Sequence, residues 1–123
     1  MIVNVETREL SPGINMITFT GRLVLGRDLT DAERKVRNFI QEGSDKLVLD
    51  FSGLEYIDSS GIGVLAVCAG LMDEKGGKLA AVCSDGQVKK LLKLTRLDQV
   101  MGVFEDSASA HKSLQAPDAP PQT

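Results

Sequence analysis

Two short apolar segments in the middle of the chain, separated by a helical pattern, most strongly limit the fold. Residues 46–51 and 78–83 are apolar and bounded by polar groups, which is typical of strands buried inside a sheet. A helical stretch begins at Ser60 or Gly61 and ends near residues 76–77, between these two strands. A strand, a helix and a second strand in this order predict parallel pairing through a right-handed crossover. We therefore expect an α/β protein.

The first forty residues predict a hairpin followed by an amphipathic helix. Apolar and polar residues alternate from Val3 to Arg8, and the alternation resumes over residues 14–21 after a turn signal at residues 11–13. Thr30 and Glu33 fit a capping box at the start of the helix. Its apolar face is indicated by residues at three- and four-residue spacing, namely Leu29, Ala32, Val36, Phe39 and Ile40.

The remaining segments complete one domain. Residues 88–95 predict a third helix, residues 103–104 a minimal edge strand, and residues 106–114 a final helix capped by Asp106 or Ser107. We expect a single domain over residues 1–114, with a mixed sheet formed by an antiparallel hairpin and then parallel strands. About four helices should pack mainly on one face of this sheet. Residues 115–123 are rich in Pro and Ala and are expected to form a disordered tail.

Composition disfavours several classes of function. The net charge is −3 and aromatic residues make up 4% of the 123 residues, so no nucleic-acid partner is expected. Cys68 and Cys83 lack the spacing of a disulfide framework or a metal site, and we interpret them as reduced core residues of a cytoplasmic protein. Because residue 1 leads directly into the alternating strand pattern, we expect no signal peptide. The longest apolar stretch, residues 61–72, is about half the ~20 residues that span a bilayer, so direct membrane insertion is not expected.

Asp58, Ser59 and Ser60 place a carboxylate and two hydroxyls between the central strand and its helix. Residues 52–59 are expected to form a loop, so these side chains should lie at the edge where the strands end. Ser59 or Ser60 can cap the helix with its side-chain oxygen. A serine exposed there can also be phosphorylated, which adds about −1.5 to −2 charges. The two uses are compatible, because negative charge at a helix N-terminus is favourable by ~0.3–1 kcal/mol.

The helix after this site has no polar face from Ile62 to Met72. Either another helix covers its outer side, or part of that side is a docking surface. Val64, Val67, Cys68 and Leu71 are expected to share the outer face. The complete set of predicted partner-binding residues is Asp58, Ser59, Ser60, Gly61, Ile62, Val64, Val67 and Cys68.

Motifs for enzyme chemistry are incomplete. Residues 61–66 match the dinucleotide fingerprint G-x-G-x-x-A, but that fingerprint needs a tight strand-to-helix turn, and the expected loop of about eight residues separates the two elements. The glycine that a nucleophile elbow needs two positions before its serine is missing. His111 is the sole histidine and lies near the C-terminus, so it cannot complete a triad there or hold a metal alone. We expect no cofactor, no metal and no enzymatic activity.

The run from Asp58 to Leu65 (DSSGIGVL) resembles the signature of the STAS family, specifically the bacterial anti-sigma factor antagonists. The resemblance covers roughly residues 2–114. Weaker supporting segments occur in the same order as in the family, namely residues 20–23 (TGRL), 47–51 (LVLDF), 76–79 (GGKL) and 88–97 (VKKLLKLTRL).

The resemblance implies a partner switch. The unphosphorylated antagonist would bind a serine-kinase anti-sigma factor and release the sigma factor. The kinase would phosphorylate the serine directly after the aspartate, here Ser59, and a metal-dependent serine phosphatase would reverse the reaction. Asp58 would orient the Ser59 hydroxyl or contact the kinase, and Ser60 would be a neighbouring cap.

One position departs from the family pattern. Family members commonly carry an acidic residue after the Gly-x-Leu that closes the second strand, whereas Val24 stands there in this chain and Asp28 is the nearest acid. The alternative function is a constitutive interaction module of the same fold, a scaffold or transporter accessory that phosphorylation does not switch.

Overall fold

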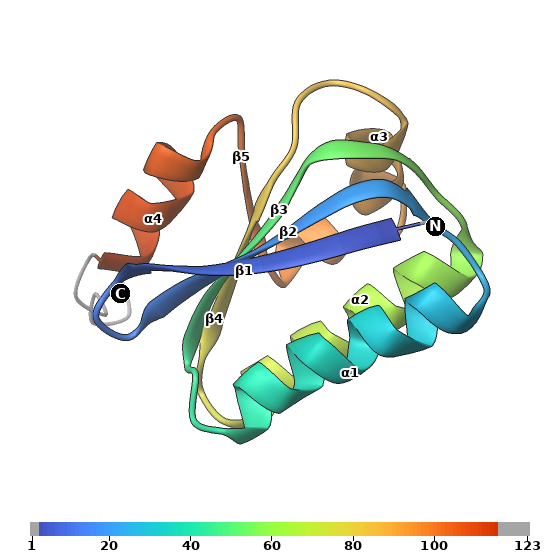
Figure 1. Ribbon diagram of the computed structural model, residues 1–123. Helices are drawn as coiled ribbons and strands as arrows, with labels where there is room; N and C mark the ends of the chain where they lie inside the picture. Colours follow the sequence, from blue (N-terminus) through green and yellow to red (C-terminus); the bar gives the residue numbers. More distant parts are fainter. Residues whose placement is uncertain (1–2, 116–123) are drawn as a thin grey trace.

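The computed structural model describes residues 3–115, which form a five-stranded mixed sheet with helices on both sides (Figure 1). The strands lie in the order β1-β2-β3-β4-β5. The first pair is antiparallel and the other three pairs are parallel, as the sequence predicts. The elements are β1 (Val3–Ser11), β2 (Ile14–Leu23), α1 (Arg27–Gln41), β3 (Lys46–Ile57), α2 (Ser59–Glu74), β4 (Lys78–Val82), α3 (Gln87–Leu94), the 3-10 turn η1 (Leu97–Gln99), β5 (Gly102–Phe104) and α4 (Ser107–Gln115).

The helices divide unequally between the two faces of the sheet. Each face has its own core, because side chains along a strand point alternately to the two faces. Ile17 and Leu49 point into the larger core, which α1, α2 and α3 cover. Met16 and Val48, one residue earlier on each strand, point into a smaller core that α4 covers with Ala110. Figure 1 shows α4 on the opposite side of the sheet from α1 and α2. The prediction of helices mainly on one face is confirmed.

The predicted capping box of the first helix is wrong. Helix α1 begins at Arg27, three residues before Thr30, and its N-cap is Gly26 without a side-chain cap. Gly26 has a φ of +155°, which side-chain-bearing residues rarely adopt, and this lets the chain turn into the helix directly after Val24 and Leu25. Thr30 therefore lies inside the first turn, where its hydroxyl donates to the Gly26 carbonyl at 3.5 Å.

The C-terminal elements agree with the sequence. Strand β5 pairs with β4 over three residues, and Asp106 caps α4, since its Oδ1 accepts a hydrogen bond from the Ser109 amide at 2.7 Å. Gln115 belongs to α4, and the rest of the tail predicted at 115–123 lies outside the described residues. Within residues 3–115 the structure contains no helix long and apolar enough to cross a membrane.

Candidate functional site at the start of helix α2

The predicted loop over residues 52–59 is wrong, because β3 continues to Ile57. Strand β4 stops opposite Asp50, but β2 keeps pairing with β3 as far as Leu23 and Ile57, through two shifts in register. Pairing with β2 therefore holds in a strand a segment whose polar residues read locally as a loop. Asp58 alone separates the end of β3 from Ser59, the first residue of α2.

Asp58 is the centre of the site. Its Oδ1 accepts a hydrogen bond from the Gly61 amide at 2.9 Å, which makes Asp58 the N-cap of α2. Its Oδ2 accepts one from the Leu25 amide at 3.0 Å, and its own amide donates to the Leu23 carbonyl at 3.3 Å. The carboxylate thus joins α2 to the connection between β2 and α1. Asp58 takes the capping role that local sequence predicts for Ser59 or Ser60.

The charge of Asp58 is stabilised by these contacts. The Leu25 amide first, and the Gly61 amide second, hold the pKa of the Asp58 carboxyl below its usual range. Backbone N–H groups favour the ionised form, because a carboxylate accepts hydrogen bonds more strongly than a neutral acid does. The carboxylate is therefore ionised at neutral pH and engaged with the backbone on both oxygens.

The two serines differ in exposure. Ser59 is exposed, whereas Ser60 is half-buried. Within residues 3–115 the Ser59 hydroxyl has no hydrogen-bond partner, since Asp58 already caps the helix. A change at the Ser59 hydroxyl would therefore break no hydrogen bond of the described residues.

The two glycines of the site have different roles. A Cβ on Gly61 would collide with the Leu23 carbonyl oxygen and with the Ile57 side chain, so glycine allows α2 to start directly against the sheet. A Cβ on Gly63 would meet open space. The strand-to-helix turn is tight, so the long loop is not a valid reason to set aside the dinucleotide fingerprint. The close approach at Gly61 is instead made to the protein's own backbone.

The outer face of α2 is not the one predicted. Cys68 is fully buried and cannot contact a partner, because it packs with Leu65 into the larger core. Val67 exposes 46% of its surface, and the half-buried residues Ile62, Val64 and Leu71 pack partly against that core. Helix α1 packs beside α2, which accounts for much of the missing polar face. The exposed stripe of α2 runs instead through Ser59, Gly63, Ala66, Val67 and Gly70.

Gln87 is a residue of the site that the sequence did not indicate. It is the first residue of α3, and its side-chain amide forms two hydrogen bonds with the backbone of Ile57, donating to the carbonyl at 2.9 Å and accepting from the amide at 3.1 Å. It takes the place of a neighbouring strand where β4 has ended. A single glutamine carries no pattern that would reveal this role, because the contact joins residues 30 positions apart.

Two exposed apolar side chains flank Asp58. Leu25, in the connection between β2 and α1, exposes 75% of its surface. Tyr56, near the end of β3, exposes 39%, and the Arg22 guanidinium lies 5.1 Å from the centre of its ring. Neither is predicted as a site residue, because local sequence does not show which apolar side chains stay exposed in a connection or at the end of a strand.

Comparison with known proteins places this geometry in a family. The model of the STAS domain matches residues 7–110. An anti-sigma F factor antagonist of Paenibacillus polymyxa is 30% identical over 71 residues, which cover 58% of this chain and 61% of that protein.

Two solved structures show the same fold. The crystal structure of an anti-sigma factor antagonist from Mycobacterium paratuberculosis has a TM-score of 0.80 at 17% identity, covering 93% of this chain and 95% of that one. The Bacillus cell fate determinant SpoIIAA in its phosphorylated form has a TM-score of 0.72 at 15% identity, covering 89% and 99%. Because the family model spans most of the sequence, the chain belongs to the STAS domain family.

Proposed function

We propose that this protein is an anti-sigma factor antagonist that acts as a phosphorylation-controlled partner switch. In its unphosphorylated form it binds a serine-kinase anti-sigma factor in the cytoplasm, so that the sigma factor is freed. Phosphorylation of Ser59 releases the antagonist, and a metal-dependent serine phosphatase restores the binding form. The observation that carries the proposal is that Ser59 is exposed at the first position of α2 while Asp58 caps the helix.

Phosphate on Ser59 would leave the fold intact. The added charge would lie at the N-terminus of α2, where negative charge is favourable by about 0.3–1 kcal/mol. The Asp58 carboxylate beside it would repel the phosphate, but both groups face water, which screens the repulsion. The domain should therefore tolerate the modification.

The same phosphate would oppose binding of a partner. The proposed docking surface combines Ser59 with the exposed residues Leu25, Tyr56 and Val67. Ser59 and Val67 share the exposed stripe of α2, and the Leu25 amide binds Asp58 next to Ser59, so a partner docked on these residues would also cover Ser59. Burial of a phosphate against an apolar or acidic surface costs several kcal/mol through desolvation and like-charge repulsion. This difference between the effect on the fold and the effect on the complex is what a reversible switch needs.

The relatives support the assignment. The Paenibacillus relative is an anti-sigma F factor antagonist, and one of the structures that share this fold is a phosphorylated form. Next to Val24, which stands where family members commonly carry an acid, Leu25 presents its side chain to solvent and its amide to Asp58.

The first test is peptide mass spectrometry of the protein isolated from its own cells, with and without phosphatase treatment. We expect phosphate on Ser59 and none on Ser60. The second test compares Ser59→Ala, Ser59→Asp and the matched control Ser60→Ala for binding to the kinase. Ser59→Ala and the control should bind it, and Ser59→Asp should not. Equal binding by all three, with no phosphate found under any growth condition, would favour a constitutive interaction module.

A further inference from the structure

Strand β1 leaves one edge of the sheet open. Within residues 3–115 it pairs with β2 along one side only, and the strand order places it at the end of the sheet. Its other side therefore offers backbone N–H and C=O groups to an added strand. The strand is nine residues long and most of it is exposed, including Glu6, Arg8 and Glu9. Figure 1 shows β1 at the outside of the sheet, with α1 beneath it.

The charges on this edge are complementary to those of a second copy in one register. In an antiparallel pair of strands, residues directly opposite each other point to the same side of the sheet. When a twofold axis relates the two strands, one residue therefore faces its own copy, and the other pairs are arranged symmetrically about it. When Thr7 is that residue, Glu6 faces Arg8 of the second copy, and Arg8 faces its Glu6. Opposite charges that face each other across strands are stabilising. The twofold axis repeats the pair, so each dimer contains it twice.

Neighbouring registers lack this match. Centring the pair on Glu6 or on Glu9 brings two glutamates together, and centring it on Arg8 brings two arginines together. Centring it on Val5 faces Glu6 with Asn4 and pairs no opposite charges. Like charges directly opposite each other are destabilising. Of these registers, only the one centred on Thr7 pairs opposite charges, so the order of charges along β1 favours it.

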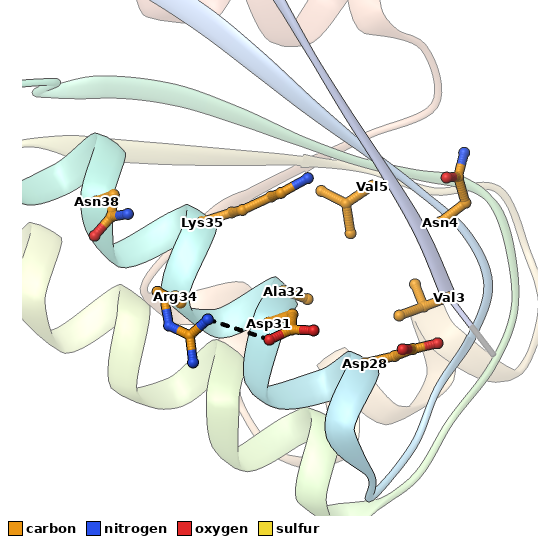
Figure 2. A pocket seen from close by; sticks show the side chains of 9 residues that line it. All are labelled: Val3, Asn4, Val5, Asp28, Asp31, Ala32, Arg34, Lys35 and Asn38. Carbon is orange, nitrogen blue, oxygen red and sulfur yellow. Dashed lines mark hydrogen bonds and ion pairs between the residues drawn. The ribbon is translucent and has the colours of Figure 1, made fainter. Parts of the chain in front are cut away.

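The space beneath the open edge fits the same arrangement. A groove of about 490 Å³ lies between β1 and α1, lined by Val3, Val5 and Lys35 among others. A second hollow of about 300 Å³ continues it as far as Thr7 and shares Val5 and Lys35 with it. Figure 2 shows the side chains of Val3 and Val5 directed into the groove and Lys35 extending from α1 toward Val5. An added strand would extend the sheet over this space.

The register also matches charge inside the groove. With Thr7 at the centre, Glu9 of the second copy faces Val5, on the side of the sheet that α1 covers. It would therefore lie beside Lys35, which lines the groove next to Val5. One register thus matches opposite charges on both sides of β1, through Glu6 and Arg8 on one side and through Glu9 and Lys35 on the other.

We propose that this protein forms a twofold-symmetric dimer in which β1 pairs antiparallel with β1 of a second copy, centred on Thr7. The sheets of the two copies then join into one continuous sheet. The dimer does not depend on the proposed switch, because β1 is separated from β3 by β2 and Ser59 lies at the start of α2. Both copies would keep Ser59 exposed.

The test uses the full chain and two charge reversals. In the Glu6→Arg dimer, arginine faces arginine at both charge pairs, and in the Arg8→Glu dimer, glutamate faces glutamate. The dissociation constant of each variant dimer should therefore be at least about tenfold higher than that of the wild type. The double variant Glu6→Arg/Arg8→Glu restores opposite charges and should dimerise again. Sedimentation velocity over a range of micromolar concentrations gives the dissociation constants, and circular dichroism confirms that each variant is folded.

Mixing the two single variants gives a sharper result. In a mixed dimer, the two arginines of the Glu6→Arg chain face the two glutamates of the Arg8→Glu chain, so native mass spectrometry should show the mixed dimer in preference to either homodimer. Glu74→Arg, an equal charge reversal on an exposed residue at the end of α2, should leave dissociation unchanged. A wild type that stays monomeric at every concentration would overturn the proposal. A dimer that tolerates both single reversals would also overturn it.

Discussion

Asp58 offers the most direct test of how the site is held together, because one carboxylate joins two backbone segments. Replacement by Ala removes the 2.9 Å hydrogen bond from the Gly61 amide and the 3.0 Å hydrogen bond from the Leu25 amide. Replacement by Asn keeps an oxygen that can cap α2 at Gly61, but turns an amide NH₂ group toward the Leu25 N–H. We expect both variants to be less stable than the wild type, and Asp58→Ala to be the less stable of the two.

The expected size follows from the two contacts. Loss of an N-cap side chain costs about 0.5–2 kcal/mol. Loss of the exposed bond from Leu25 adds roughly 0.5–1.5 kcal/mol. Asp58→Ala should therefore lower the free energy of unfolding by about 1–3.5 kcal/mol, and Asp58→Asn by about 1 kcal/mol. For a domain of this size each kcal/mol lowers Tm by roughly 3–6 °C.

The pH dependence gives an independent check. The pKa of Asp58 is lower in the folded state than its ordinary value of 3.8, which applies in the unfolded chain. Its stabilising effect is therefore fully present above pH 3.8 and is lost as the pH falls through the lower pKa of the folded state. The difference in stability between wild type and Asp58→Asn should be constant above that pH and narrow below it.

The assay is urea unfolding followed by circular dichroism, at neutral pH and then at successively lower pH. Asp106→Ala is the matched control, since Asp106 caps α4 through the Ser109 amide without joining a second backbone segment. Asp58→Ala should lower the free energy of unfolding by more than this control does. If Asp58→Ala changes stability by less than about 0.3 kcal/mol, or by less than the control, the account of Asp58 as a joint between α2 and the β2–α1 connection is refuted.

Three further changes test the surroundings of the site. Gly61→Ala should destabilise the fold by about 1–3 kcal/mol, because its Cβ would collide with the sheet. Gly63→Ala, in open space on the same helix, should stabilise the fold by roughly 0.5–1 kcal/mol. Thermal unfolding measures both changes in stability, and equal effects of the two variants would contradict the packing described. Gln87→Ala should speed hydrogen exchange at the Ile57 amide, and unchanged exchange there would show that the side chain does not hold the strand end. Burial raises the pKa of the Cys68 thiol to about 11, so it should react with a thiol reagent only after denaturation; rapid labelling of the native protein would contradict its burial.

The position of the site could be predicted from the sequence, but its internal contacts could not. The order of apolar segments places Asp58 and Ser59 between a central strand and its helix, and the structure has them there. The cap was assigned to the wrong residue by one or two positions, because Asp58 and both serines are all good cap residues in local sequence. Which of them caps α2 depends on where β3 ends, and that depends on pairing with β2.

The outer face of α2 shows a second limit. A helix whose residues are nearly all apolar has no periodic signal that separates its buried side from its exposed side. Cys68 was therefore assigned to the outer face, although it is fully buried, and Gly63 and Ala66 were not, although they are exposed. The rotation of α2 about its axis is decided by packing against both the sheet and α1.

Local sequence was sufficient to specify the elements that depend on neighbours in the chain, namely the hairpin, the parallel strands and their crossover helices, and it narrowed the cap of α4 to Asp106 or Ser107. Periodicity and turn residues act over a few positions, so one sequence contains that information. Tertiary contacts alone set the length of β3, the hydrogen bond between Asp58 and the Leu25 amide, and the pairing of Gln87 with Ile57. These contacts join residues about 30 positions apart, and they form only because the sheet brings the carboxyl ends of β2 and β3 together with the start of α3.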